Sequence, residues 1–176
     1  LRLPEHGGGV DGGAPGGAER GRDGLECSTD AAQVVGAVAL HLHETAWEIA
    51  QSEQKFGLRP LARLKALGLA SPQLVAVHMT QVVAEDLDTL ADAGASVVHC
   101  PESNLKLGAG VCPLPALLGR GIRVALGTDG AASNNDLDVL GEARTAGLVA
   151  SGMTGAPGSL IASDLLRMAT LEGARI

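Results

Sequence analysis

The sequence predicts an α/β fold in which helices cover a parallel sheet, and two observations lead to this prediction. First, four short apolar runs after residue 31 each end in a polar residue, and helical patterns lie between them. Second, the runs are almost continuously apolar, as expected of parallel strands that are buried on both faces. The remaining choice is between a doubly wound sheet and a barrel.

The elements are predicted in chain order from these runs and from the periodicity between them. The four strands are expected in residues 38–44, 74–78, 96–101 and 122–129. Helices are expected in residues 46–55, 60–67, 84–93, 135–149 and 163–171. Pro60 and Pro113 fit helix starts, Ser163 or Asp164 is the expected cap of the last helix, and Glu102 to Asn104 is turn-like.

The residues at the run ends favour the barrel. Histidines and an aspartate follow successive runs: His41, His43, His78, His99 and Asp129. In a (β/α)8 TIM barrel the carboxyl ends of the strands form the catalytic face, where side chains from different strands meet. A whole barrel needs eight strands and about 200 to 250 residues. We therefore expect a partial barrel.

The net charge and the aromatic content exclude one class of function, nucleic-acid binding. The 176-residue chain has a net charge of −7, and aromatic residues make up 1% of it. Nucleic-acid surfaces need basic stripes and stacking platforms, so no nucleic-acid partner is expected.

No apolar run is long enough to cross a membrane. Cys27, Cys100 and Cys112 show no CxxC spacing, so neither a disulfide framework nor a zinc knuckle is expected. A cytoplasmic location is expected by default.

Residues 1–30 differ from the rest of the chain. They are dominated by glycine, proline, alanine and charge without any periodicity. We interpret them as a disordered or foreign flank, and residues 31–176 as the folded domain.

The densest group of candidate ligands is His41-Leu-His-Glu. Alternate strand residues share a face, so His41 and His43 are expected to point together, while Glu44 begins the turn and can swing over the strand end. Buried polar groups without partners cost about 1 to 3 kcal/mol, so such density on an apolar strand is uncommon. The alternative for one of the two histidines is a packed core residue.

The other candidates are single residues. His78 is expected at a strand exit, with a satisfied core histidine as the alternative. His99 is expected to cap a strand end, and Cys100 and Cys112 to be small buried hydrophobes. Asp129 stands between Gly127 and Gly130, whose missing side chains would let a metal or substrate approach.

Taken together, imidazoles and carboxylates on successive strand ends predict a site for a divalent metal of the zinc or iron kind. Such an ion lowers the pKa of its water, and a nearby carboxylate can carry protons. The glycine-containing runs match neither the dinucleotide fingerprint nor the phosphate loop, so no nucleotide cofactor is expected.

These residues resemble the amidohydrolase superfamily, in the branch of triazine hydrolases and methylthioadenosine/S-adenosylhomocysteine deaminases. The matching stretches span roughly residues 37 to 175 and are HLHETAWEIAQSE, LVAVHMTQV, VVHCPESNLKLGAGVCP, VALGTDGAASNNDLD and LLRMATLEGAR. The resemblance implies that the chain holds strands five to eight of the barrel. It also implies zinc, or else iron(II), as the cofactor, and a purine nucleoside or related heterocycle as the substrate.

The resemblance also implies roles for four side chains. His41 and Asp129 would be metal ligands, and Asp129 would take a proton from the activated water. His78 would lie beside that water and contact the substrate. Glu44 would shuttle protons and grip the substrate, so that an adenine-type base loses its amino group as ammonia. Ser103 and Asn104 would give structural support.

Alternatives remain open within this resemblance. The same strands serve guanine deamination and the dechlorination of triazines. The family's first-strand His-x-His pair, which supplies two further ligands, has no counterpart here, so a domain truncated at both ends and a non-catalytic fragment are also expected possibilities. The full-length protein is expected to form a homo-oligomer.

Overall fold

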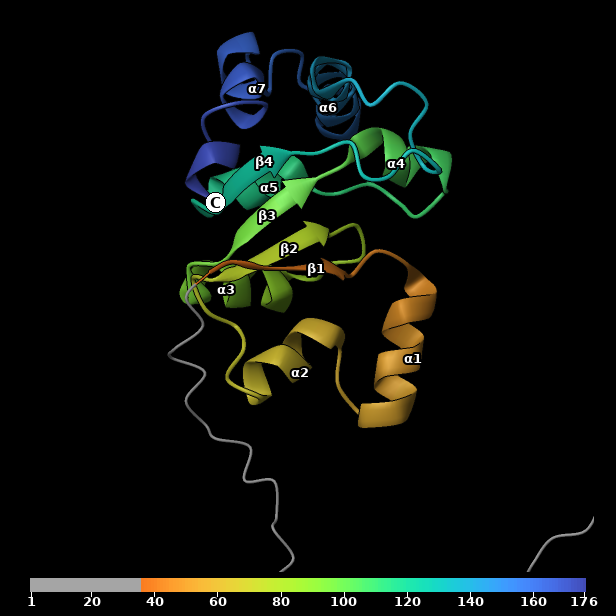
Figure 1. Cartoon of the computed structure of the whole chain (residues 1–176), viewed down its shortest axis with the longest axis vertical. Helices are drawn as coiled ribbons and strands as arrows, with labels where there is room; N and C mark the ends of the chain where they lie inside the picture. Colours follow the sequence, from red (N-terminus) through yellow and green to blue (C-terminus); the bar gives the residue numbers. More distant parts are fainter. Residues whose placement is uncertain (1–35) are drawn as a thin grey trace, which may run out of the picture. The chain divides into compact units, whose positions relative to one another are not determined.

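The computed structural model describes residues 36–176 (Figure 1). Its elements are β1 (Val38–Leu42), α1 (Ala46–Phe56), α2 (Pro60–Ala66), β2 (Leu74–His78), α3 (Ala84–Ala93), β3 (Ser96–His99), α4 (Pro101–Lys106), α5 (Leu114–Gly119), β4 (Arg123–Leu126), α6 (Val139–Thr154), α7 (Ala162–Met168) and the 3₁₀ helix η2 (Gly173–Arg175). The predicted flank of residues 1–30 and Cys27 lie outside the described residues.

The four strands form one parallel sheet in the order β1-β2-β3-β4. The predicted α/β fold is therefore confirmed. The register pairs His41 with Val77 and His99 with Leu126, so the carboxyl ends of neighbouring strands lie at the same edge. This edge is where the sequence places the candidate side chains.

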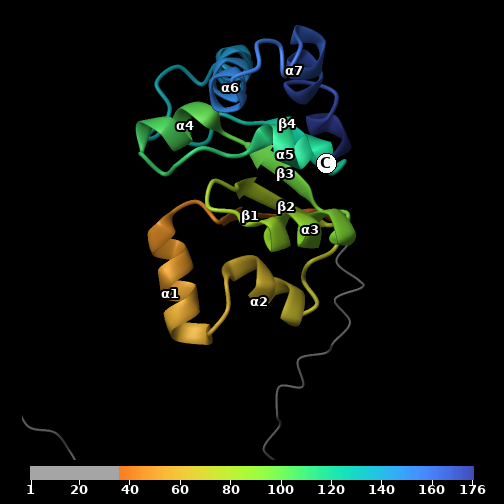
Figure 2. The ribbon, with the colours of Figure 1, turned by 180° about the vertical axis from the view of Figure 1, so that it is seen from behind.

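Helices α3 and α5 cover one face of the sheet, lying behind it in Figure 1 and in front of it in Figure 2. Buried apolar side chains from alternate strand residues and from the helices α2, α3, α5, α6 and α7 form a single core. Its members include Leu61, Leu74, Ala76, Leu87, Leu90, Val97, Leu114, Leu117 and Val124. None of the helices within residues 36–176 is long and apolar enough to cross a membrane.

Helix α6 begins later than the sequence predicts. The expected helix covers 135–149, whereas α6 runs over Val139–Thr154. The side-chain oxygen of Asn134 accepts hydrogen bonds from the backbone N–H groups of Asp136 and Leu137, and Leu137 has a φ of 56°. This local turn competes with the helix and delays its start.

The last predicted helix is also shorter than expected. Helix α7 covers Ala162–Met168 instead of 163–171. Neither Ser163 nor Asp164 caps it, because the N-cap is Ile161, whose side chain makes no hydrogen bond there. The turn-like Glu102 to Asn104 belongs to the short helix α4.

Truncating a buried leucine should destabilise the protein more than truncating an exposed one. Leu90 is fully buried in α3, whereas Leu67, just after α2, is 58% exposed. We expect Leu90→Ala to lower the free energy of unfolding by about 2–5 kcal/mol, because the cavity cannot fully collapse. Leu67→Ala should cost less than about 0.5 kcal/mol. Denaturant titration measures both, and equal losses would contradict the described core.

Candidate metal centre

The backbone is strained at the ends of the strands. Positive φ angles occur at His43, which follows β1 (53°), at His78, the last residue of β2 (79°), and at Asp129, beyond β4 (59°). Residues other than glycine seldom adopt this conformation, which costs of order 1–3 kcal/mol, and such residues cluster at functional sites. The strain therefore points to the carboxyl edge of the sheet as the functional edge.

Three of the predicted side chains meet there. The Nε2 atom of His78 lies 3.2 Å from Nδ1 of His41, and the two rings pack edge to face. Oε2 of Glu44 lies 3.6 Å from His41 Nδ1 and 3.8 Å from His78 Nε2. His78 is fully buried, whereas the side chain of His41 is 60% exposed. The group is thus anchored on one side and accessible on the other.

Asp129 joins this group from the loop after β4. Its Oδ2 atom accepts hydrogen bonds of 2.7 Å from the hydroxyls of Ser103 and Ser133. Burial raises the pKa of Asp129, but the hydrogen bonds from Ser103, Ser133 and the Gly130 backbone outweigh burial, so the pKa lies below its ordinary value. The carboxylate is held ionised and can ligate a cation through its other oxygen.

The residues present fit a divalent metal ion. One ligand atom each from His41, His78 and Asp129 lies within 4.8 Å of the others. Two imidazoles and a carboxylate are a donor set that suits zinc or iron(II). The structure thus brings together His41, Glu44, His78 and Asp129.

His43 does not share this site, contrary to the expected alternation. Strand β1 ends at Leu42, and the positive φ of His43 breaks the strand geometry. Its ring is fully buried, with Nε2 accepting from the Leu61 backbone N–H and Nδ1 lying 3.1 Å from the Gln81 carbonyl. His43 is therefore the packed core histidine.

A buried ion pair fixes the loops around His43. Arg59 donates two hydrogen bonds, of 2.8 and 3.0 Å, to Oδ2 of Asp86. Burial raises the pKa of Asp86, but hydrogen bonds from His43 and Arg59 outweigh it and lower the pKa to about 2. This pair ties the start of α2 to the start of α3.

Sequence reasoning missed the residue that holds Glu44 in place. The Glu48 carboxylate accepts hydrogen bonds from the backbone N–H groups of His43 (3.0 Å) and Glu44 (2.7 Å). Thr45 caps α1 by accepting from the Glu48 backbone N–H. The spacing Thr45-x-x-Glu48 is that of a capping box, a signal that was available in the sequence, but Glu48 binds the N–H groups of the two residues before Thr45 and not that of Thr45 itself. The buried Thr80 adds a hydrogen bond to the Glu44 carbonyl.

A second missed residue is Glu142 of α6, which is fully buried. Its carboxylate accepts from the backbone N–H of Glu102 (3.0 Å) and from the Asn134 side chain (2.6 Å). It therefore links α4 to the loop that carries Ser133. Burial is the main cause that raises the pKa of Glu142 to about 7. No spacing in the sequence indicates this contact, because it joins residues 40 positions apart.

The remaining candidates lie outside the group. His99 is buried at the end of β3, and burial lowers its pKa to about 4, so it stays neutral near pH 7. Cys100 and Cys112 are free and buried, and burial raises the pKa of both thiols. All three are packing residues.

Gly127 makes room for the neighbouring strand. A Cβ there would lie 2.8 Å from Cγ1 of Val98 and 3.3 Å from Sγ of Cys100. The expectation that Gly127 leaves space for a metal or substrate is thus wrong. A Cβ at Gly130 would meet nothing within 4 Å.

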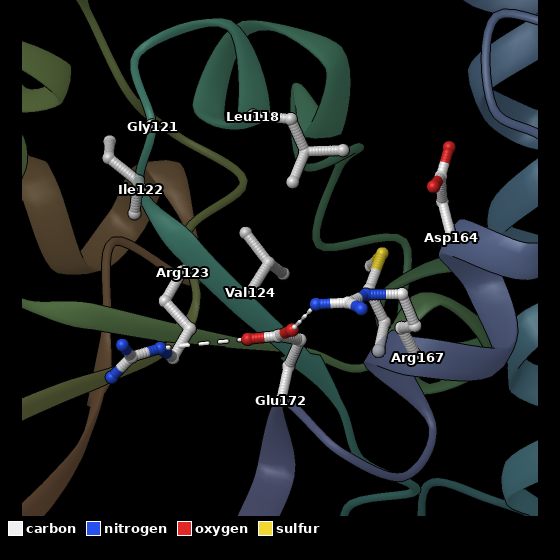
Figure 3. Close-up of a pocket in the computed structure, with 9 residues that line it drawn as sticks. Leu118, Gly121, Ile122, Arg123, Val124, Asp164, Arg167 and Glu172 are labelled. Atoms are coloured by element: carbon white, nitrogen blue, oxygen red, sulfur yellow. Dashed lines mark hydrogen bonds and ion pairs between the residues drawn. The ribbon is translucent and has the colours of Figure 1, made fainter. Parts of the chain in front are cut away.

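A cavity of about 500 Å³ lies at the other end of β4 (Figure 3). Arg123 and Arg167 point toward Glu172, which pairs with both at 3.6 and 2.8 Å. Because these charges satisfy one another and lie at the amino end of the strand, the cavity is separate from the metal centre.

The sequence is similar to those of known proteins. The sequence model of the amidohydrolase family matches residues 5–176. The 5-methylthioadenosine/S-adenosylhomocysteine deaminase of Teredinibacter turnerae is 51% identical over 138 residues, which are 78% of this chain and 31% of that protein. The enzyme of the same name from Moorella thermoacetica is 46% identical over 140 residues, covering 78% and 33%. The chain thus spans about a third of the length of these relatives.

Solved structures of related proteins share the fold of this chain. An adenosine deaminase from Xanthomonas campestris with bound zinc superimposes with a TM-score of 0.77 at 52% identity, over 79% of this chain and 32% of that one. Atrazine chlorohydrolase from Arthrobacter aurescens, in complex with zinc, gives a TM-score of 0.74 at 32% identity, over 79% and 31%. These similarities confirm the predicted partial barrel.

Titration of Glu142 should make stability depend on pH. Its pKa rises from an ordinary 4.5 to about 7 on folding. The stability from its protonated form is therefore complete below about pH 4.5 and is lost as the pH rises through about 7. The difference in unfolding free energy between wild type and Glu142→Gln should fall over this range, by at most about 1.4 kcal/mol per pH unit.

Denaturant titrations at several pH values measure this difference. Glu85→Gln, at an exposed residue of α3, is the matched control and should keep a constant offset from wild type. Because His99 titrates equally in all three proteins, its opposite slope cancels. A constant offset for Glu142→Gln would contradict the raised pKa.

Proposed function

Because this chain belongs to the amidohydrolase family, we propose that it supplies one part of the active site of a metal-dependent aminohydrolase. This part lies at the carboxyl ends of its strands. The proposed substrate is an adenine-type nucleoside, 5′-methylthioadenosine or S-adenosylhomocysteine, in line with the names of the relatives. Water replaces the amino group of the ring, and ammonia leaves. The observation that carries the proposal is the convergence of Glu44 on the paired His41 and His78 rings beside Asp129.

The metal in this proposal is zinc, with iron(II) as the alternative. His41 and Asp129 are the proposed ligands, and the zinc in the related structures supports the choice of ion. A bound zinc ion would lower the pKa of water from 15.7 to about 7. The ionised Asp129, fixed by Ser103 and Ser133, can take a proton from that water.

Glu44 is the proposed proton carrier. Its carboxylate is partly exposed, so a ring can reach it, while its backbone is fixed by Glu48 and Thr80. Deamination needs one proton on the ring nitrogen and one on the leaving amine, and the attacking water supplies both. In this proposal Glu44 accepts one of them and delivers it to the ring nitrogen, and the proton taken by Asp129 goes to the leaving amine. His78 is the proposed neighbour of the water and of the substrate ring.

The second candidate function is hydrolytic dechlorination of a triazine, favoured by the similarity to atrazine chlorohydrolase. Guanine or another heterocycle is a further candidate within the deaminase class. All are displacements by water on an electron-poor ring. We also propose a cytoplasmic protein that binds small molecules and forms a homo-oligomer at full length.

The chain by itself is a third candidate, as a non-catalytic piece. Catalytic zinc sites use three protein ligands, whereas only His41 and Asp129 are proposed as ligands here, because His78 is assigned to the water and the substrate. Within residues 36–176 the one His-x-His sequence is His41-Leu-His43, and its two rings diverge. We expect the isolated chain to release no ammonia from methylthioadenosine. Turnover together with one tightly held zinc per chain would refute this candidate.

A chimaera tests the role of Glu44. The 138 aligned residues of this chain replace their counterparts in the Teredinibacter turnerae relative. We expect the chimaera to release ammonia from methylthioadenosine, and Glu44→Gln to lower kcat at least about 100-fold while zinc is retained. Glu53→Gln, at an exposed carboxylate of α1, is the control. Unchanged turnover in Glu44→Gln would remove Glu44 from the mechanism, and chloride release from a chlorotriazine alone would favour the second candidate.

Zinc content tests the proposed ligands in the same chimaera. His41→Ala and Asp129→Ala should each weaken zinc binding more than about 100-fold, because loss of a ligand exceeds the 10- to 100-fold effect of losing an outer partner. Competition with a chelator measures this affinity. Asp88→Asn, at an exposed carboxylate paired with Arg120, is the control. Full zinc occupancy in either ligand variant would contradict that ligand's role.

A further inference from the structure

Asn104 contacts the buried histidine of the site. Its Oδ1 atom lies 2.8 Å from Nδ1 of His78, and both side chains are at most 1% exposed. Within residues 36–176 the Asn104 side chain makes no other hydrogen bond, since its Nδ2 is buried without a partner. The amide is therefore committed to His78.

This contact determines where the His78 proton lies. An amide oxygen only accepts hydrogen bonds, so Nδ1 of His78 must carry the hydrogen. A neutral imidazole has one N–H, which leaves a lone pair on Nε2. That atom faces Nδ1 of His41 at 3.2 Å and Oε2 of Glu44 at 3.8 Å. A metal ligand, or an acceptor for the proton of water, needs such a lone pair.

Helix α4 fixes the position of the Asn104 side-chain amide relative to His78. The Asn104 backbone N–H donates to the Cys100 carbonyl, and its own carbonyl accepts from Ala109. Glu142 binds the backbone N–H of Glu102 at the start of the same helix. The preceding residue, Ser103, donates to Oδ2 of Asp129 and so leaves Oδ1 available. Two consecutive residues of α4 thus set the free acceptor atoms of His78 and Asp129.

We propose that Asn104 is a positioning residue that holds His78 as the Nδ1–H tautomer, with the Nε2 lone pair directed at His41 and Glu44. The role of this lone pair in binding metal or accepting a proton rests on the proposed function. The assignment of the tautomer rests only on the contact between Asn104 and His78. Its assignment goes beyond general structural support, because it predicts a specific proton position.

The tautomer can be measured directly in the whole, metal-free chain. Histidine labelled with ¹⁵N gives separate signals for N–H and lone-pair nitrogens in a long-range ¹H–¹⁵N spectrum, recorded near pH 8. His78→Gln identifies the His78 signals by their loss. We expect the proton on Nδ1 of His78 in the wild-type chain. A proton on Nε2 would overturn the proposal, whatever the variants do.

Variants then test whether Asn104 causes this state. Asn104→Ala should shift His78 toward the Nε2–H tautomer, whereas Asn104→Asp keeps an acceptor oxygen and should retain Nδ1–H. The control is Asn135→Ala, an exposed residue that accepts from Lys106. A retained Nδ1–H tautomer in folded Asn104→Ala would overturn the proposal.

Zinc titration of the same samples separates this inference from the proposed function. If wild type binds zinc, Asn104→Ala should bind it about 10- to 100-fold more weakly, and Asn104→Asp should not share this loss. Equal zinc affinity in Asn104→Ala would overturn the positioning role. If the wild-type chain binds no zinc yet shows Nδ1–H on His78, the assignment of Asn104 stands and the metal site of this chain alone fails.

Discussion

Parallel pairing of the four strands is the constraint on which the site depends. The ladder joins His41 to Val77 and His99 to Leu126, so the carboxyl ends of neighbouring strands come together at one edge. Residues that are far apart in the chain, such as Glu44 and Asp129, can therefore face a common space. A shift of one residue in this register would move each side chain to the opposite face of the sheet.

At that edge the backbone leaves strand geometry, and buried polar contacts hold it there. Positive φ angles at His78 and Asp129 redirect these side chains from the directions that alternation gives. Polar side chains hold the residues at these strained positions: Asn104 contacts the His78 ring, and Ser103 and Ser133 donate to the Asp129 carboxylate. The geometry of the proposed site thus rests in part on side chains that are not proposed metal ligands.

The sequence was sufficient to predict the four strands, their parallel arrangement and the side chains at their ends, because these follow from apolar periodicity and from the edge rule of parallel sheets. It was insufficient where the structure is determined by a single backbone dihedral angle or by a hydrogen bond between residues far apart in the chain. His43 was expected beside His41 but turns into the core, and α6 starts late because of Asn134. Glu142 could not be foreseen, since its partners lie in other elements.

The most direct test is a crystal structure of the chimaera grown with zinc, with anomalous data collected at the zinc edge. The account predicts one ion about 2.0–2.2 Å from an imidazole nitrogen of His41 and a carboxylate oxygen of Asp129, with Glu44 and His78 facing it. An ion held by other residues, or Glu44 and His78 turned away from it, would contradict the account.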